Sequence, residues 1–173
     1  MTVARIGPEQ GSLLVKTYRE GMAAKAGHDL VLEVTRWEAT LDTASGTLEL
    51  SADPRALEVR EGLGGVKPLT DRDRGEIRRN IDEKVLRGQP IAFRSNAVRI
   101  PEGPGRLAVE GELTMAGSTR PLTAELDVGE GGRVAATIVL TQSAWGIKPY
   151  RGLMGALKVR DDVEIVVDAL PPP

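Results

Sequence analysis

The sequence predicts an all-β protein, an up-and-down antiparallel barrel of about eight strands with one amphipathic helix at about residues 71–87 and an internal apolar cavity. Apolar and polar residues alternate with period two in many segments, as they do in half-buried antiparallel strands. The chain holds 20 glycines and 11 prolines, which suits many short connections. Several of the segments reach about ten residues, and long strands joined in order by hairpins favour a closed barrel over a small sandwich.

The first strand patterns are long and irregular. Residues 12–18 open the series, and residues 29–41 follow with a change of apolar phase near Thr35 that predicts a bulge or a strong coil. The two phases are formed by Leu30, Leu32 and Val34, and then by Trp37, Ala39 and Leu41. Residues 47–60 form a third pattern that Pro54 interrupts, so we expect one bent strand there.

A single segment, residues 71–87, departs from the strand pattern. Its apolar residues recur every four positions, at Ile77, Ile81 and Val85. This spacing places them on one face of a helix, with charged residues on the other face. Thr70 is the expected N-cap, with Asp73 at the third helical position of a capping box. Gly88 can adopt the left-handed conformation after the last turn, and Pro90 prevents continuation.

The second half of the chain contains further strand patterns joined by turn signals, and the pattern at 133–143 has apolar residues in both phases. The expected strands are 91–100, 107–115, 122–128, 133–143 and 163–169. The expected hairpin turns are 43–46, 101–105, 117–120 and 129–132. Trp, Tyr and Phe number only 2, 2 and 1, so the interior must be built mainly from aliphatic side chains.

Composition excludes several classes of protein. The 173 residues suit one domain, 1–173, and the formal charge of −2 lacks the basic excess of a nucleic-acid binder. Without cysteine, and with one histidine, the chain offers no disulfide framework, no thiolate or His-rich metal site and no cysteine nucleophile. We expect neither metal nor cofactor. No signal peptide and no apolar run of about 18 residues is present, so we expect a cytoplasmic protein without an integral membrane segment.

The one histidine, His28, has two interpretations that the sequence leaves open. It could be half-buried and satisfied by a backbone carbonyl, or it could meet a ligand head group at the pocket. A rival hypothesis is a hydrolase or isomerase that uses His28 in the same pocket. Asp29 would orient that imidazole poorly, because neighbours on a strand point to opposite faces.

A second informative stretch runs from Ser143 to Val159. It combines the aromatic residues Trp145 and Tyr150 with the cations Lys148 and Arg151. Such a mixture at a pocket entrance would suit an amphipathic anionic ligand. The alternative is a long connection packed on the end of the barrel with its cations solvated. A third hypothesis for the whole chain is an interaction module whose barrel is filled by its own side chains and whose charged helix docks a partner.

One segment resembles a known family. Residues 111–122 read Gly-Glu-Leu-Thr-Met-Ala-Gly-Ser-Thr-Arg-Pro-Leu, which is similar to the G-x-L-T-x-x-G-x-T-[RK]-P-[VL] segment of YceI-like proteins. Residues 26–29, 91–95 and 144–147 support the resemblance in order and spacing. It implies a lipocalin-like antiparallel barrel with an apolar cavity that binds polyisoprenoids or similar long-chain amphipathic lipids and performs no covalent chemistry. The family often has histidine where this chain has Ala116.

We therefore expect a non-catalytic protein that binds, carries or sequesters a long-chain amphipathic lipid, such as a polyisoprenoid, an isoprenoid quinone or a fatty-acid-like molecule. A homodimer is left open. The head-group candidate is His28, and the inward strand face supplies the apolar candidates. The expected ligand-binding residues are His28, Leu30, Leu32, Phe93, Leu113, Ile138, Leu140, Trp145, Tyr150, Lys148 and Arg151.

Overall fold

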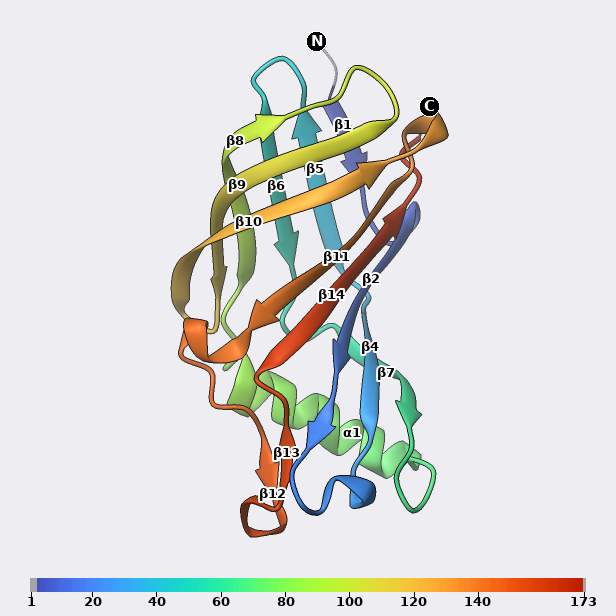
Figure 1. The fold of residues 1–173 in the computed structure, drawn as a ribbon, viewed down its shortest axis with the longest axis vertical. Coiled ribbons are helices and arrows are strands. Elements are labelled where there is room, and N and C mark those ends of the chain that lie inside the picture. Colours follow the sequence, from blue (N-terminus) through green and yellow to red (C-terminus); the bar gives the residue numbers. More distant parts are fainter. Residues whose placement is uncertain (1–2, 173) are drawn as a thin grey trace.

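A computed structural model describes residues 3–172, so residues 1, 2 and 173 of the expected domain lie outside the described part. Within that part, eleven strands form one curled antiparallel sheet and three short strands form a second sheet (Figure 1). The large sheet contains β1 (Val3–Ile6), β2 (Gly11–Thr17), β4 (Asp29–Val34), β5 (Trp37–Asp42), β6 (Thr47–Ala52), β7 (Leu57–Leu63), β8 (Ile91–Arg99), β9 (Gly105–Met115), β10 (Ser118–Val128), β11 (Val134–Thr141) and β14 (Asp162–Ala169). The small sheet contains β3 (Arg19–Glu20), β12 (Arg151–Gly152) and β13 (Leu157–Val159). The predicted all-β class is confirmed.

The predicted count of about eight strands is wrong, and bends in the chain explain the difference. The pattern at 29–41 is divided into β4 and β5, and the pattern at 47–60 into β6 and β7. β1 was not predicted at all. Pairing continues through the bends, because Thr35 N donates to Ala56 O at 2.8 Å and Asp53 N donates to Arg36 O at 3.1 Å. Each bend divides one long segment into two strands, and the two bent segments stay hydrogen-bonded to each other at the bends.

The order of the large sheet is β1-β5-β6-β8-β9-β10-β11-β14-β2-β4-β7. β2 follows β1 after a turn at residues 7–10, in which Gln10 N donates to Gly7 O at 3.0 Å. β1 and β2, β4 and β5, and β6 and β7 can each be treated as one bent strand. With these three bent strands, each strand of the large sheet pairs with the strands that come before and after it in the chain. β14, the last strand, pairs with β2. The connectivity is therefore up-and-down, as predicted.

The predicted helix is present as α1 (Asp71–Asn80), continued by the wider turn η2 (Ile81–Val85). The capping box forms, because Asp73 N donates to Thr70 Oγ1 at 3.1 Å and Thr70 N donates to Asp73 Oδ2 at 3.0 Å. The helix ends as expected, with Gly88 at φ 65° after Arg87 at φ 56°. α1 lies across the lower end of the curled sheet in Figure 1.

Arginines attach the helix at both of its ends. Arg74 Nη1 donates to Val59 O of β7 at 2.7 Å, and Arg78 Nη1 lies 3.1 Å from Glu58 Oε1 on the same strand. After the last turn, Arg87 Nη2 donates to Ala116 O at 2.5 Å. The helix therefore spans the end of the sheet from β7 to the β9–β10 turn.

Short helical turns complete the connections: η1 (Ala24–Ala26), η3 (Glu130–Gly132), η4 (Gln142–Trp145) and η5 (Leu153–Gly155). The β9–β10 turn is centred on Ala116 and Gly117, at φ 51° and 78°, so the turn predicted at 117–120 is placed too late. Among residues 3–172, no helix has both the length and the apolar character needed to cross a bilayer.

Candidate ligand-binding pocket

A pocket of about 940 Å³ lies within the curled sheet, and residues of the strands and of α1 line it. Its volume is at the upper end of the range for small-molecule sites. Six residues predicted from the apolar phase of the strands all line it: Leu30, Leu32, Phe93, Leu113, Ile138 and Leu140. The structure therefore places these residues where the inward-facing assumption put them.

The bends keep apolar side chains on the pocket wall in both halves of each divided strand. Along β4 and β5, the wall residues are Leu30, Leu32, Val34, Trp37, Ala39 and Leu41. Side chains of a strand alternate between faces, so a continuous strand would have turned the second trio outward. From Val34 to Trp37 the chain advances three positions, an odd number, so the side chains of β5 that would have pointed outward in a continuous strand face the pocket. The predicted irregularity near Thr35 is this bend.

α1 and η2 supply one wall of the pocket. The stripe of Ile77, Ile81 and Val85 lines the pocket, and none of these side chains is fully buried. Asp73 also lines it. The hydrogen bonds from the Thr70 backbone, and then from its hydroxyl, hold the pKa of Asp73 below its usual value of 3.8.

Charge on the pocket wall is confined to one end. Three segments lie beside the helix: residues 18–28, 63–70 and 146–160. We call these three segments, without the helix, the rim. Every charged residue that lines the pocket belongs either to the helix or to the rim. From the helix these residues are Asp73, Glu76 and Lys84, and from the rim they are Arg19, Lys148, Arg151 and Lys158. The deeper wall is almost entirely aliphatic. The pocket therefore has an apolar body and a charged end.

Arg19 and His28 hold the rim segments together. Arg19 Nη1 donates to Gly27 O at 2.7 Å and to Leu63 O at 2.9 Å. His28 Nε2 lies 2.7 Å from Lys67 O. A carbonyl only accepts hydrogen bonds, so Nε2 carries a proton and donates it. These bonds connect the first rim segment to the second.

The third rim segment joins the first through the small sheet. β13 pairs with β3, with Lys158 opposite Glu20, and Ala23 N donates to Ala156 O at 2.8 Å. The predicted residues Lys148, Tyr150 and Arg151 are exposed and also line the pocket. The pocket therefore reaches the surface at this end.

His28 lines the pocket, but its ring bond is of the kind expected for a histidine satisfied by a backbone carbonyl. Asp29 faces Arg19 instead, because its Oδ1 accepts from Arg19 N at 2.9 Å. Among the described residues, no carboxylate or hydroxyl group hydrogen-bonds the imidazole. The arrangement lacks the oriented base that the triad chemistry requires.

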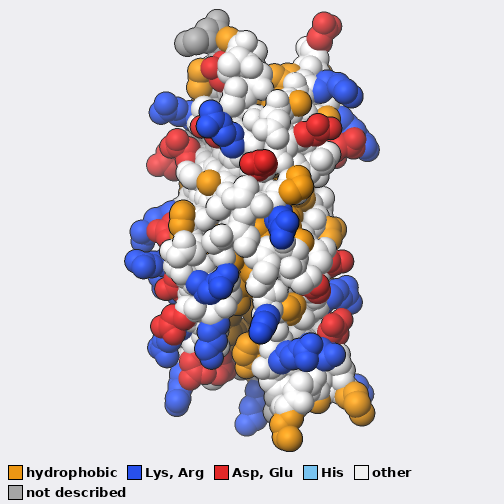
Figure 2. All heavy atoms as spheres, turned by 90° about the vertical axis from the view of Figure 1, so that its left-hand side faces the viewer, with side chains coloured by type: hydrophobic (Ala, Val, Ile, Leu, Met, Phe, Trp, Pro, Cys, Tyr) orange, Lys and Arg blue, Asp and Glu red, His pale blue; other side chains and the backbone are white. Residues whose placement is uncertain are grey.

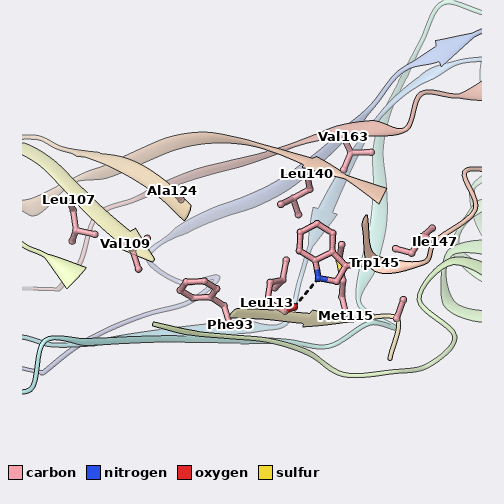
Figure 3. Close-up of a cluster of buried hydrophobic side chains, with 11 residues drawn as sticks. Phe93, Leu107, Val109, Leu113, Met115, Ala124, Leu140, Trp145, Ile147 and Val163 are labelled. Atoms are coloured by element: carbon pink, nitrogen blue, oxygen red, sulfur yellow. Dashed lines mark hydrogen bonds between the residues drawn. The ribbon is translucent and has the colours of Figure 1, made fainter. Parts of the chain in front are cut away.

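Trp145 is the one predicted site residue outside the pocket lining. Its side chain is buried, and Nε1 donates to Leu113 O at 2.8 Å within the cluster shown in Figure 3. That cluster also includes Leu140, Ile147 and Val163. Trp145 therefore fixes the η4 turn to β9 instead of facing the pocket.

Sequence reasoning missed the contribution of Arg19 and did not place the helix stripe on the pocket wall. The spacing of Ile77, Ile81 and Val85 was the available signal for a wall formed by the helix. No local signal indicated Arg19, because its partners Gly27 and Leu63 are brought to it by the fold.

Together, the curled antiparallel sheet, the helix across its end and the deep apolar pocket define a small all-β protein of the ligand-binding class. Residues 20–170 match the model of the YceI-like domain, and the chain belongs to that family. No curated protein is significantly similar to it in sequence.

Solved structures share the fold, among them the following two. BcnA of Burkholderia cenocepacia has 16% identity and a TM-score of 0.60, over 93% of this chain and 96% of that one. A polyisoprenoid binding domain from Saccharophagus degradans, implicated in plant cell wall breakdown, has 8% identity and a TM-score of 0.60, over 98% of each chain. At these identities the likeness establishes the fold.

Proposed function

We propose that the protein binds one long-chain amphipathic lipid in its pocket, without covalent chemistry, and carries or sequesters it. The observation that carries the proposal is the distribution of polarity in the pocket, which is aliphatic along its body and charged at one end. A hydrocarbon chain fits the body, and a polar head fits the end where His28, Lys148 and Arg151 lie. Polyisoprenoids, isoprenoid quinones and fatty-acid-like molecules share this form.

The size of the pocket favours a long chain over a short one. If a methylene-sized group fills roughly 30 Å³, the share of one water molecule in the liquid, about 940 Å³ holds roughly 30 such groups. Burial of each contributes about 0.8 kcal/mol, whereas association costs about 4–15 kcal/mol. About twelve groups only offset that cost, so a chain that fills the pocket gains affinity that a short acyl chain lacks.

The fold supports the same ligand class, since one solved structure of this architecture is described as a polyisoprenoid binding domain. A pocket of this volume argues against the alternative of an interaction module with a filled interior. Cytoplasmic location, a homodimer and the absence of nucleic-acid partners stay predictions.

The test is organic extraction of the purified protein followed by mass spectrometry, with two variants of β11. Ile138 lines the pocket, whereas its neighbour Val139 is exposed on the outer face. Ile138→Trp fills the pocket and should reduce bound lipid at least severalfold, and Val139→Trp should leave it unchanged. Protein that is consistently free of lipid, or equal loading of both variants, would refute the proposal.

His28 separates binding from catalysis. A catalyst would lose turnover by orders of magnitude in His28→Ala, since no other group replaces the base. We expect instead that His28→Ala keeps its extracted lipid and loses about 1 kcal/mol of stability with the hydrogen bond to Lys67 O. Extraction measures the lipid that the variant retains, and urea unfolding measures its stability. A variant of unchanged stability that has lost turnover of the bound lipid would contradict this expectation.

A further inference from the structure

The rim has a surface feature that the pocket does not explain. Eight large hydrophobic side chains are exposed among the described residues, and five of them lie in the rim: Met22, Leu63, Val66, Tyr150 and Met154. Met22 is 99% exposed and Val66 is 77% exposed. They come from all three rim segments, which Arg19, His28 and the β3–β13 pairing hold at one end of the molecule. Hydrophobic side chains are visible at the lower tip in Figure 2.

The three rim segments together carry an excess of positive charge. The rim contains seven cations, Arg19, Lys25, Lys67, Lys148, Arg151, Lys158 and Arg160, and one acid, Glu20. The whole chain, by contrast, has a net charge of −2. Lys25, Lys67, Lys148 and Arg151 are exposed, and none of the four forms an ion pair with a described residue. Lys and Arg side chains surround the hydrophobic tips in Figure 2.

We propose that the rim docks on the surface of an anionic lipid bilayer. Basic residues close to a membrane are attracted to anionic headgroups, and exposed apolar side chains insert at the boundary of headgroups and acyl chains. The five hydrophobic side chains project from three separate segments of the rim. A protein interface would instead need a continuous area of about 800 Å² on each partner.

Met154 supports this assignment by its backbone. It occupies the tip of the β12–β13 connection at φ 57°, a left-handed conformation that is unfavourable for a side chain of this size. Such positions concentrate at functional sites. Its side chain meets no covering partner at this tip, and it is fully exposed.

Docking in this orientation brings the open, charged end of the pocket to the membrane. Lys148, Tyr150 and Arg151 belong both to the rim and to the pocket lining. A lipid could then pass between bilayer and pocket without exposing its chain to water. This passage of lipid between bilayer and pocket rests on the proposed function, whereas the docking of the rim on the bilayer does not.

The experiment uses the full chain and vesicles of phosphatidylcholine, with or without about 30% phosphatidylserine, separated by flotation. We expect binding to the anionic vesicles only, and loss of that binding when salt rises to about 1 M and shortens the Debye length to about 3 Å. Absence of binding to the anionic vesicles, or equal binding to both compositions, would overturn the proposal.

Variants outside the pocket lining localise the binding. Lys25→Gln with Lys67→Gln should weaken vesicle binding about fivefold for each cation removed, and Met22→Ser with Met154→Ser should weaken it at least severalfold. The matched controls, Arg5→Gln with Arg99→Gln and Val3→Ser with Leu170→Ser, alter exposed residues outside the rim and should change nothing. Equal losses in the controls would contradict the assignment.

Two further readouts separate this proposal from its alternatives. Light scattering measures the oligomeric state. A dimer that depends on Met22 and Met154, in a protein that does not bind vesicles, would overturn the proposal. Lipid extraction of the rim variants should show an unchanged pocket load. Vesicle binding by protein that never contains lipid would refute the proposed function but support docking, and lipid-loaded protein without vesicle binding would refute docking alone.

Discussion

The two tryptophans differ in one hydrogen bond. Both side chains are buried, at 4% exposed for Trp145 and 6% for Trp37. The Nε1 of Trp145 donates to Leu113 O, whereas the buried Nε1 of Trp37 has no hydrogen-bond partner among the described residues. A buried donor without a partner costs free energy. Trp37 therefore stabilises the fold by apolar burial alone, and Trp145 by burial and a hydrogen bond.

Replacing each tryptophan by phenylalanine should expose this difference. The change removes the same atoms at both positions, but only Trp145→Phe also removes a hydrogen bond, the one from Nε1 to the Leu113 carbonyl. We expect Trp145→Phe to lower the free energy of unfolding by about 1–2 kcal/mol more than Trp37→Phe does. Urea unfolding of the two variants measures it, and equal losses would show that the hydrogen bond has no net effect.

At the scale of elements, glycines mark where the sheet is crowded and where the helix is open. A Cβ on Gly111 of β9 would lie 2.3 Å from Arg94 O and 2.7 Å from Phe93 Cζ. The aromatic ring of β8 therefore covers the space above this glycine. A Cβ on Gly75, in α1, would meet nothing within 4 Å.

The same substitution should consequently have opposite effects at the two glycines. Gly111→Ala should destabilise the protein by about 1–3 kcal/mol, because backbone and ring must both shift. Gly75→Ala should stabilise it by up to about 1 kcal/mol, because alanine is the better helix former. Thermal unfolding compares them directly, and a stabilised Gly111→Ala variant would contradict the packing described for β8 and β9.

The capping box gives the helix a dependence on pH. Thr70→Ala should cost about 1 kcal/mol, and Thr70→Ser should cost much less because it keeps the hydroxyl. The pKa of Asp73 is lower in the folded protein than its usual 3.8, so the stability that it contributes is present above about pH 4 and is lost as pH falls through the folded value.

Stability measured between about pH 2 and 6 should therefore show a smaller acid-induced loss in Thr70→Ala than in the parent chain. An identical pH profile for the two proteins would argue that the Asp73 carboxylate does not act through the Thr70 hydroxyl.

At the scale of the whole molecule, the sheet encloses an apolar pocket where other small proteins place a solid core. Two clusters of buried side chains line the wall, one around Phe93 and Leu113 and one around Leu32 and Trp37. Both clusters are incomplete toward the pocket, whose lining includes members of each. A bound chain would complete them, so ligand and stability should be coupled.

Removal of bound lipid should lower the thermal unfolding temperature. A ligand at about a hundred times its dissociation constant stabilises a protein by about 2.7 kcal/mol, which corresponds to roughly 5–10 °C for a chain of this length. Calorimetry before extraction, after it, and after addition of a polyprenol measures this shift. Ile138→Trp serves as the control that should not respond, and a parent protein that does not respond either would contradict the coupling.

The sequence by itself determined the strand periodicity, the inward apolar faces and the helix with both its ends. These features depend on neighbours a few residues apart, at spacings fixed by the geometry of strands and helices. The alternation placed Leu30 and Phe93 on the apolar faces of their strands, and both residues line the pocket.

The sequence located the bends near Thr35 and Pro54, but the tertiary structure alone decided that each bent segment is divided into two strands. It also decided that Trp145 faces the core and how the rim is assembled. Arg19 meets Leu63, His28 meets Lys67, and β3 meets β13 across separations of 39 residues or more. No local pattern encodes such contacts, because they exist only after the whole sheet has curled and brought its loops to one end.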